Sequence, residues 1–356
     1  MVHIREYKNG DEEGIIPLFN KVFVEKRSKE YWLWQFKGNP LKEPIIIIAE
    51  DNSKLVGQAT LLPTEVLIKR EKVYAGQSLD VMVDTDYRRQ GIYEKMAFKS
   101  YDIGIERDIK FRYGFPSKSA LEGLIKKLGG ILTTEIPLYM KIYNLNDILT
   151  ALIKIEVLAK VFSKPITFLI NKIIYKEEGI TVKNDYEIKE IFEFNKDFDK
   201  LWEKIKADYP IMSERTSKFL NWRIKDHPAK CYKAFAAYSG EQLEGYIVLK
   251  IENRTLKGKY KSKSGSIVDI IGTQKDVIKA LYLKADNCFR NEKVDLSIIW
   301  LTDSMRYKKM FKSFGFFKTK STIPFVVKDL TKDKELEDFI IKEDNWYLMP
   351  IESDFY

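Results

Sequence analysis

A segment repeated at constant spacing constrains this chain most, because a duplicated segment predicts two copies of one folded unit. Residues Tyr31–Pro40 resemble Phe219–Pro228, and 188 residues separate the tryptophans, and likewise the prolines, of the two copies. The same spacing relates Gly57 to Gly245 further along the chain. Each copy has the pattern of a helix followed by two strands joined at a polar turn and then a third strand. We therefore expect two related halves.

The length of the chain supports two domains, since 356 residues exceed the roughly 250–300 at which one hydrophobic core stops growing. The patterns predict an α/β (α+β) fold in which each half has a mixed, mostly antiparallel sheet flanked by helices. We predict a first half over 1–145, an amphipathic helical linker over 146–182, a second half over 183–330 and a tail over 331–356.

The predicted linker has two interpretations. Over 147–175 aliphatic residues alternate with lysines, a pattern of amphipathic helices, and Pro165 divides the stretch into two. The helix pair either packs on the domains as a brace or lies on a membrane surface, which lysine-rich polar faces also favour.

Composition limits the chemistry. The formal charge of +9 suits an anionic ligand, an acidic membrane face or nucleic acid, although neither zinc-finger spacing nor an RNA-binding signature occurs. Cys231 and Cys288 form no CxxC pair, and His3 and His227 are the only histidines, so we expect no metal centre and no histidine-based triad. The sequence contains no signal core and no long uncharged apolar run, and we expect a cytoplasmic protein.

The segment after the third strand of the first half carries the clearest chemical signal. A strand ends at Val83, a turn contains Arg88, Arg89 and Gly91, and helical periodicity follows from Ile92. Unpaired backbone N–H groups at a helix start and the helix dipole favour a bound anion. Two arginines can add charge-assisted hydrogen bonds, so the turn predicts a pyrophosphate site.

At these residues the chain resembles the GNAT superfamily of CoA-dependent N-acyltransferases. Arg88-x-x-Gly91 after a valine-ended strand matches the family signature, and Tyr93 departs from it where Gly or Ala is usual. The order of elements and the duplication are similar to tandem members, Eis-like and surface-polysaccharide-associated acetyltransferases among them. The resemblance implies acetyl-CoA as acyl donor, bound by Met82, Val83, Arg88, Arg89, Gln90, Gly91, Ile92, Tyr93 and Ser119.

The resemblance also implies direct attack of an amine on the thioester, with a backbone N–H near Met82 meeting the oxyanion. Asp80, a carboxylate in an otherwise apolar strand, is the candidate base, and Tyr113 is a candidate acid. The tyrosine acid that is frequent in the family would fall near Ile125. A structural Asp80 remains an alternative, because Asp269 repeats it where no such turn follows.

The second half lacks the features of a second donor site. Gly272 comes too early to match Gly91, and Asp276 would repel a pyrophosphate at the helix start. We expect one CoA per chain, with an aminosugar, a small amine or a peptide amine as acceptor, no nucleic-acid partner, and peripheral membrane contact through 147–175 if that segment lies on a membrane. The alternatives are a Fem-like aminoacyl-tRNA-dependent transferase and a non-catalytic binding or membrane-surface module.

Overall fold

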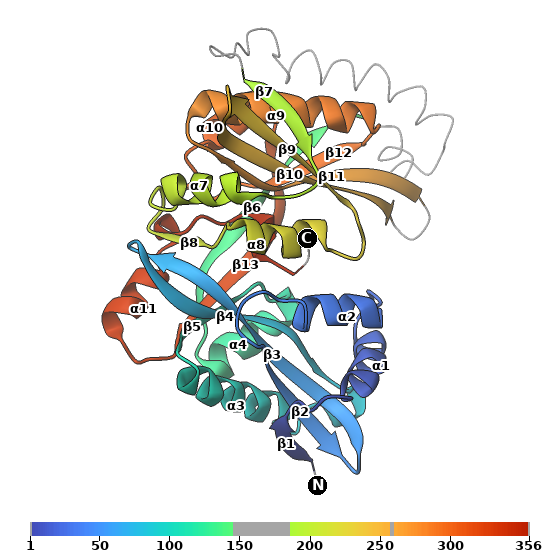
Figure 1. The fold of residues 1–356 in the computed structure, drawn as a ribbon. Helices are drawn as coiled ribbons and strands as arrows, with labels where there is room; N and C mark the ends of the chain where they lie inside the picture. Colours follow the sequence, from blue (N-terminus) through green and yellow to red (C-terminus); the bar gives the residue numbers. More distant parts are fainter. Residues whose placement is uncertain (1, 145–185, 257–259, 355–356) are drawn as a thin grey trace. The chain divides into compact units, whose positions relative to one another are not determined.

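The computed structural model describes residues 2–144, 186–256 and 260–354 (Figure 1). The predicted linker lies wholly outside the described residues, so the interpretations of 147–175 and the boundaries at 145 and 182 stay predictions. The chain forms two compact units, each assembled from three stretches of sequence. Unit 1 comprises 1–135, 206–229 and 323–347, and unit 2 comprises 136–205, 230–322 and 348–356.

Unit 1 contains the predicted hairpin and third strand of the first half. Its elements are β1 (His3–Glu6), α1 (Glu12–Val22), α2 (Lys29–Phe36), β2 (Ile45–Asp51), β3 (Lys54–Ile68), β4 (Glu71–Val83), η1 (Thr85–Tyr87), α3 (Ile92–Glu106), β5 (Ile109–Gly114), α4 (Lys118–Leu128), β8 (Ile211–Ser213), α8 (Ser217–Leu220), η2 (Asn221–Lys225), β13 (Phe317–Asp329), α11 (Lys334–Ile340) and η3 (Glu343–Asn345). Strands follow the order β1-β2-β3-β4-β5-β13, and β8 pairs with β3.

Helix α3 connects two parallel strands of this sheet. β4 and β5 are parallel, which requires a crossover, whereas the other pairs listed above are antiparallel. α3 packs on β2 and β3, where Met96 fits against Gly57, a position at which a Cβ would lie 2.9 Å from the Met96 Cε. The apolar core beneath α3 thus fixes the start of the helix at the end of β4.

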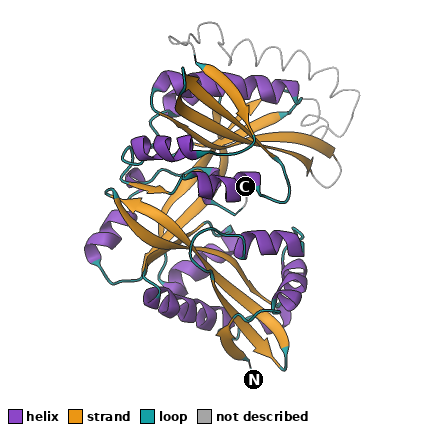
Figure 2. Cartoon of the chain, viewed as in Figure 1, coloured by secondary structure: helices purple, strands orange, loops and turns teal. Residues whose placement is uncertain are grey.

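Unit 2 is built on the same plan. Its elements are β6 (Ile131–Ile142), β7 (Glu187–Ile191), α7 (Lys196–Ile205), β9 (Tyr232–Ser239), β10 (Gln242–Leu256), β11 (Tyr260–Gly272), α9 (Lys275–Asn291), β12 (Leu296–Trp300), α10 (Lys308–Ser313) and η4 (Pro350–Glu352). Strands follow the order β6-β12-β11-β10-β9-β7, with β11 parallel to β12. Helix α9 packs on β9, β10 and β11. Figure 2 shows helices beside the sheet within each unit.

The predicted fold class is confirmed: each unit has a mixed, mostly antiparallel sheet with flanking helices. The strands do not all stay with the half of the sequence that contains them. β13 follows the second repeat, yet its residues from Ile323 belong to unit 1 and pair with β5. β6 follows α4, yet its residues from Ile136 belong to unit 2 and pair with β12.

The repeated tryptophans meet inside unit 1. The rings of Trp34 and Trp222 stack with centroids 5.4 Å apart. The Trp34 indole N–H donates to the Trp222 carbonyl at 2.7 Å, and the Trp222 indole donates to the Trp34 carbonyl at 2.9 Å. His227 lies with its ring centroid 4.4 Å from that of Trp34. The two copies of the repeated segment therefore pack against each other through these rings.

No helix in the described part of the chain combines the length and the apolar character needed to cross a bilayer.

Candidate functional site

A buried carboxylate shapes the turn that follows β4. The backbone N–H of Asp84 donates to the Val56 carbonyl at 2.8 Å, which extends the strand pairing by one residue. Its carboxylate accepts from Lys21 at 2.6 Å and from the Asp86 N–H at 3.3 Å, and Lys54 lies 3.3 Å away. The Lys21 ammonium lowers the pKa of Asp84 to about 2. The sequence analysis did not single out Asp84, although its place directly after the strand was visible.

Arg88, Arg89 and Gln90 are exposed in the turn, and Gly91 after them is half-buried. Arg89 and Gly91 are left-handed, with φ of 64° and 71°. A Cβ at Gly91 would meet no atom within 4 Å, so the space above its backbone is open. Gly91 precedes α3 without a side-chain cap, and the first helical hydrogen bond runs from the Lys95 N–H to the Gly91 carbonyl. The N–H groups of Ile92 and Tyr93 are therefore available to an anion, whereas the Glu94 N–H donates to its own carboxylate.

The first turn of α3 explains the departure at Tyr93. Ile92 is buried, and the Tyr93 ring packs against the apolar core below α3. Burial raises the pKa of the Tyr93 phenol to about 12. A large residue is accommodated here because it points into the core and leaves the turn itself open.

A bulge in β4 places Asp80. Gln58 pairs with Met82 and Thr60 pairs with Leu79, so Asp80 and Val81 together oppose one residue of β3. Asp80 has a φ of 51°, a conformation that non-glycine residues adopt at a cost of about 1–3 kcal/mol. The bulge therefore turns a carboxylate away from the regular alternation of the strand.

The Asp80 carboxylate is buried and paired with Arg27, which the sequence analysis missed because 53 residues separate the two. The Arg27 guanidinium also lies 4.0 Å from the Phe19 ring centroid and 4.9 Å from that of Tyr31. Burial raises the pKa of the Asp80 carboxyl, and the Arg27 charge opposes that rise. Beside the pair, Gln58 donates to the Asp80 carbonyl at 3.4 Å.

The pairing of β4 with β5 ends before the bulge at Asp80 and Val81. Their parallel register runs from Tyr74 beside Ile109 to Gln77 beside Tyr113, and the register contains no later pair between these strands. Met82 and Val83 lie beyond this point and keep their pairing with β3 alone. The backbone of β4 at Met82 therefore has no pairing with β5.

Tyr113 and Ser119 lie on opposite sides of the β5–α4 connection. Tyr113 is buried, and its hydroxyl lies 3.3 Å from the Thr64 hydroxyl. Its ring packs near Phe325 and Trp346, with centroids 6.1 and 6.2 Å away. Ser119 is exposed in the first turn of α4.

The corresponding turn of unit 2 is shorter and has no arginine. Only Thr273 and Gln274 lie between the end of β11 at Gly272 and the start of α9. In the first turn of α9 the Asp276 carboxylate pairs with Lys279 at 2.8 Å. In β11, the Asp269 carboxylate accepts from the Tyr246 hydroxyl at 2.8 Å.

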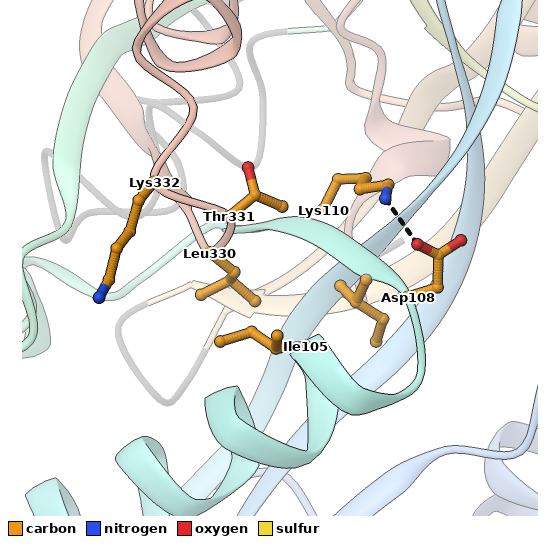
Figure 3. A pocket seen from close by; sticks show the side chains of 7 residues that line it. Ile105, Asp108, Lys110, Leu330, Thr331 and Lys332 are labelled. Atoms are coloured by element: carbon orange, nitrogen blue, oxygen red, sulfur yellow. Dashed lines mark ion pairs between the residues drawn. The ribbon is translucent and has the colours of Figure 1, made fainter.

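A cavity of about 370 Å³ lies in unit 1 at the other end of α3, lined by Ile105, the start of β5 and Leu330–Lys332 (Figure 3). The Lys110–Asp108 ion pair, 2.6 Å long, borders it. None of the predicted site residues line it. Among the described residues, no group of three or more His, Cys, Asp and Glu side chains is arranged to hold a metal ion.

The predicted site residues all lie in one stretch of the chain that matches a known protein family. The family described as "Acetyltransferase (GNAT) domain" matches residues 3–123, a range that contains every predicted site residue. No curated protein sequence matches the chain.

Similar solved structures cover most of the chain. A probable N-acyltransferase from Enterococcus faecalis has a TM-score of 0.64 and 12% identity over 93% of this chain and 73% of that chain. A GCN5-related N-acetyltransferase from Anabaena variabilis has a TM-score of 0.65 and 12% identity over 93% of this chain and 73% of that chain. N-myristoyltransferase from Saccharomyces cerevisiae, with bound myristoyl-CoA, has a TM-score of 0.61 and 11% identity over 92% of this chain and 82% of that chain. At such identities the likeness shows a shared fold.

Proposed function

Residues 3–123 are a GNAT acetyltransferase domain, and from this premise we propose that the protein transfers an acyl group, acetyl in the simplest case, from acyl-CoA to a primary amine. The observation that carries the proposal is the open turn at Gly91, where exposed Arg88 and Arg89 stand beside an uncapped helix start. The pyrophosphate binds there, held by the first N–H groups of α3 and by the two guanidinium groups.

The pantetheine arm then follows β4 past Val83 and Met82 toward the bulge. The neutral amine attacks the thioester carbonyl, so a C–N bond forms and the C–S bond breaks, with its electron pair leaving on sulfur. The backbone beside Met82, which does not pair with β5, supplies an N–H for the oxyanion. Ser119, at the start of α4, contacts the arm.

Asp80 and Tyr113 carry out the two proton transfers of the reaction. The amine must lose a proton before or during attack, and Asp80 is the base; its buried position raises its pKa toward a useful range. Arg27 holds that carboxylate in place. Tyr113, with its hydroxyl beside Thr64, protonates the leaving thiolate. The acceptor is an aminosugar, a small amine or a peptide amine.

Calorimetry tests the donor site. The double variant Arg88→Glu/Arg89→Glu should lose acetyl-CoA binding by at least 100-fold, with unchanged folding, because both side chains are exposed. The matched control is Lys29→Glu/Lys126→Glu, which makes the same charge change at exposed sites elsewhere in unit 1. The wild type should bind one CoA per chain. Equal affinity in both double variants would contradict the assignment, as would two equivalent CoA sites.

The same titration identifies the acyl group. Acetyl-CoA and myristoyl-CoA are compared with CoA alone, since a structurally similar enzyme holds myristoyl-CoA. A ligand at 100 times its Kd stabilises the fold by about 2.7 kcal/mol, which thermal unfolding readily detects. Stabilisation by RNA without any by acyl-CoA would support the aminoacyl-tRNA alternative instead.

A further inference from the structure

Arg112, in the middle of β5, is a fully buried cation that does not belong to the turn between β4 and α3. Its side chain is 0% exposed. Arg112 forms no ion pair with any described residue, and its Nε and Nη2 atoms have no hydrogen-bond partner there. Buried charges are normally paired, because desolvation without a partner is costly. The Tyr101 ring, with its centroid 5.7 Å from the guanidinium carbon, is a weak substitute.

The two unpartnered atoms have a specific geometry. Nε and Nη2 flank one edge of the planar guanidinium, and this edge donates two parallel hydrogen bonds to a carboxylate or phosphate. A neutral acceptor would satisfy the hydrogen bonds and leave the charge uncompensated. The free edge therefore favours an oxyanion.

A second cation lies at the same place. Lys328 stands beside Arg112 in the register of β13 and β5. Its side-chain ammonium has no ion-pair or hydrogen-bond partner among the described residues. A Cβ at Gly129 would lie 2.9 Å from the Lys328 Nζ, and a Cβ at Gly130 would lie 2.8 Å from the Arg112 Nη2. Both cations thus converge on the glycine pair that ends α4.

The end of α4 compensates these charges only in part. Carbonyl groups at a helix C-terminus attract cations, but the effect corresponds to about half an elementary charge. Two positive side chains, Arg112 and Lys328, lie at this helix end. The remaining positive charge is what a bound oxyanion would neutralise.

We propose that Arg112 and Lys328, with the Gly129–Gly130 backbone, form a binding site for the oxyanion of a small ligand, a carboxylate or a phosphate group. The site does not depend on the proposed acyl transfer: Arg112 stands beside Gly76 in the sheet, six residues before Met82. Because the guanidinium is buried, the glycine pair has to move to admit the ion. The oxyanion belongs either to a free inorganic ion or to the carboxylate of a small organic acid.

Thermal unfolding of the full chain tests the site, with inorganic phosphate titrated against chloride at constant ionic strength. The wild type should show a saturable rise of Tm with phosphate. Arg112→Met should abolish the rise, and its Tm without phosphate should be equal to or above that of the wild type, since an apolar side chain replaces an unpaired buried charge. Lys328→Met should weaken phosphate binding at least tenfold. Lys110→Met, on the same strand but paired with Asp108, is the control and should respond like the wild type.

Calorimetry with phosphate and succinate separates the two sources. Succinate binding at least tenfold tighter than phosphate, in the wild type but not in Arg112→Met, would assign an organic carboxylate to Arg112. Saturable phosphate binding as tight as that of succinate, or tighter, would support an inorganic ion. A Tm rise that does not saturate, or that persists in Arg112→Met, means an adventitious ion only and overturns the proposal. A large loss of stability in Arg112→Met without phosphate also overturns it, because the arginine would then be a structural cap on α4.

Discussion

The turn after β4 in unit 1 and the turn after β11 in unit 2 follow the same arrangement of strands but differ in length and charge. In unit 1 a left-handed Gly91 leaves open space above a helix start that has no side-chain cap. In unit 2 only Thr273 and Gln274 separate β11 from α9. The turn of unit 1 has two exposed arginines beside the helix start and the turn of unit 2 has none, so only the first favours a bound anion.

The aspartates of the third strands each have a partner within their own unit. Asp80 pairs with the charged Arg27, and one partner of Asp269 is the Tyr246 hydroxyl. Both carboxyls are buried. A buried carboxylate loses more stabilisation when a cationic partner is removed than when a hydroxyl partner is removed. This contrast can be tested with one variant in each unit.

The largest expected effect comes from Arg27→Met, which should cost about 3–5 kcal/mol of unfolding free energy because Asp80 is left buried without its cation. Tyr246→Phe should cost about 1–3 kcal/mol. Chemical denaturation of the two variants measures the difference. Arg27→Met/Asp80→Asn should recover much of the loss, and a double variant as unstable as Arg27→Met would contradict the pairing argument.

The pH dependence of Arg27→Met has a defined sign. Burial raises the folded-state pKa of Asp80, and loss of Arg27 raises it further. The folded protein then retains a proton that the unfolded chain releases near pH 4, so stability falls as pH rises from there to the folded pKa. The deficit against wild type should therefore shrink in acid. A deficit independent of pH would attribute the loss to Arg27 packing on Phe19 instead.

A smaller effect separates Gly91→Ala from Gly240→Ala. Both glycines are left-handed, with φ of 71° and 59°, and both face open space. Each substitution should therefore cost a similar 1–2 kcal/mol of backbone strain. Only Gly91→Ala should also weaken acetyl-CoA binding, by about 10- to 100-fold, which calorimetry measures. Equal binding by both variants would break the contrast between the two units.

The smallest effect concerns two acids whose pKa is lowered to about 2, Asp84 by Lys21 and Glu292 by Lys233 and Lys263. Each contributes stability that is present above the unfolded pKa near 4 and is lost as pH falls toward 2. With partly exposed lysine partners, we expect about 1 kcal/mol from each. Asp84→Asn and Glu292→Gln should both flatten the acid limb of the stability curve. Asp84→Asn alone should weaken acetyl-CoA binding, about threefold to tenfold, and an equal loss in Glu292→Gln would show a general effect of charge.

The sequence by itself determined the local features of the donor turn. The polar turn between β2 and β3, the strand ending at Val83 and the glycine before α3 all follow from residue type and spacing within a few positions. The repeat likewise predicted the shared element order of the two units. Such features are readable because periodicity, glycine conformation and helix starts depend on neighbours in the chain.

The tertiary structure decided which distant groups meet. It brought Arg27 to Asp80, placed Lys21 and Lys54 on Asp84, and left Arg112 buried without a carboxylate. It also placed β13 beside β5, far from its own repeat in the sequence. No spacing rule encodes these outcomes, because burial and charge pairing depend on long-range packing, and the free energy of a buried charge depends on every group around it.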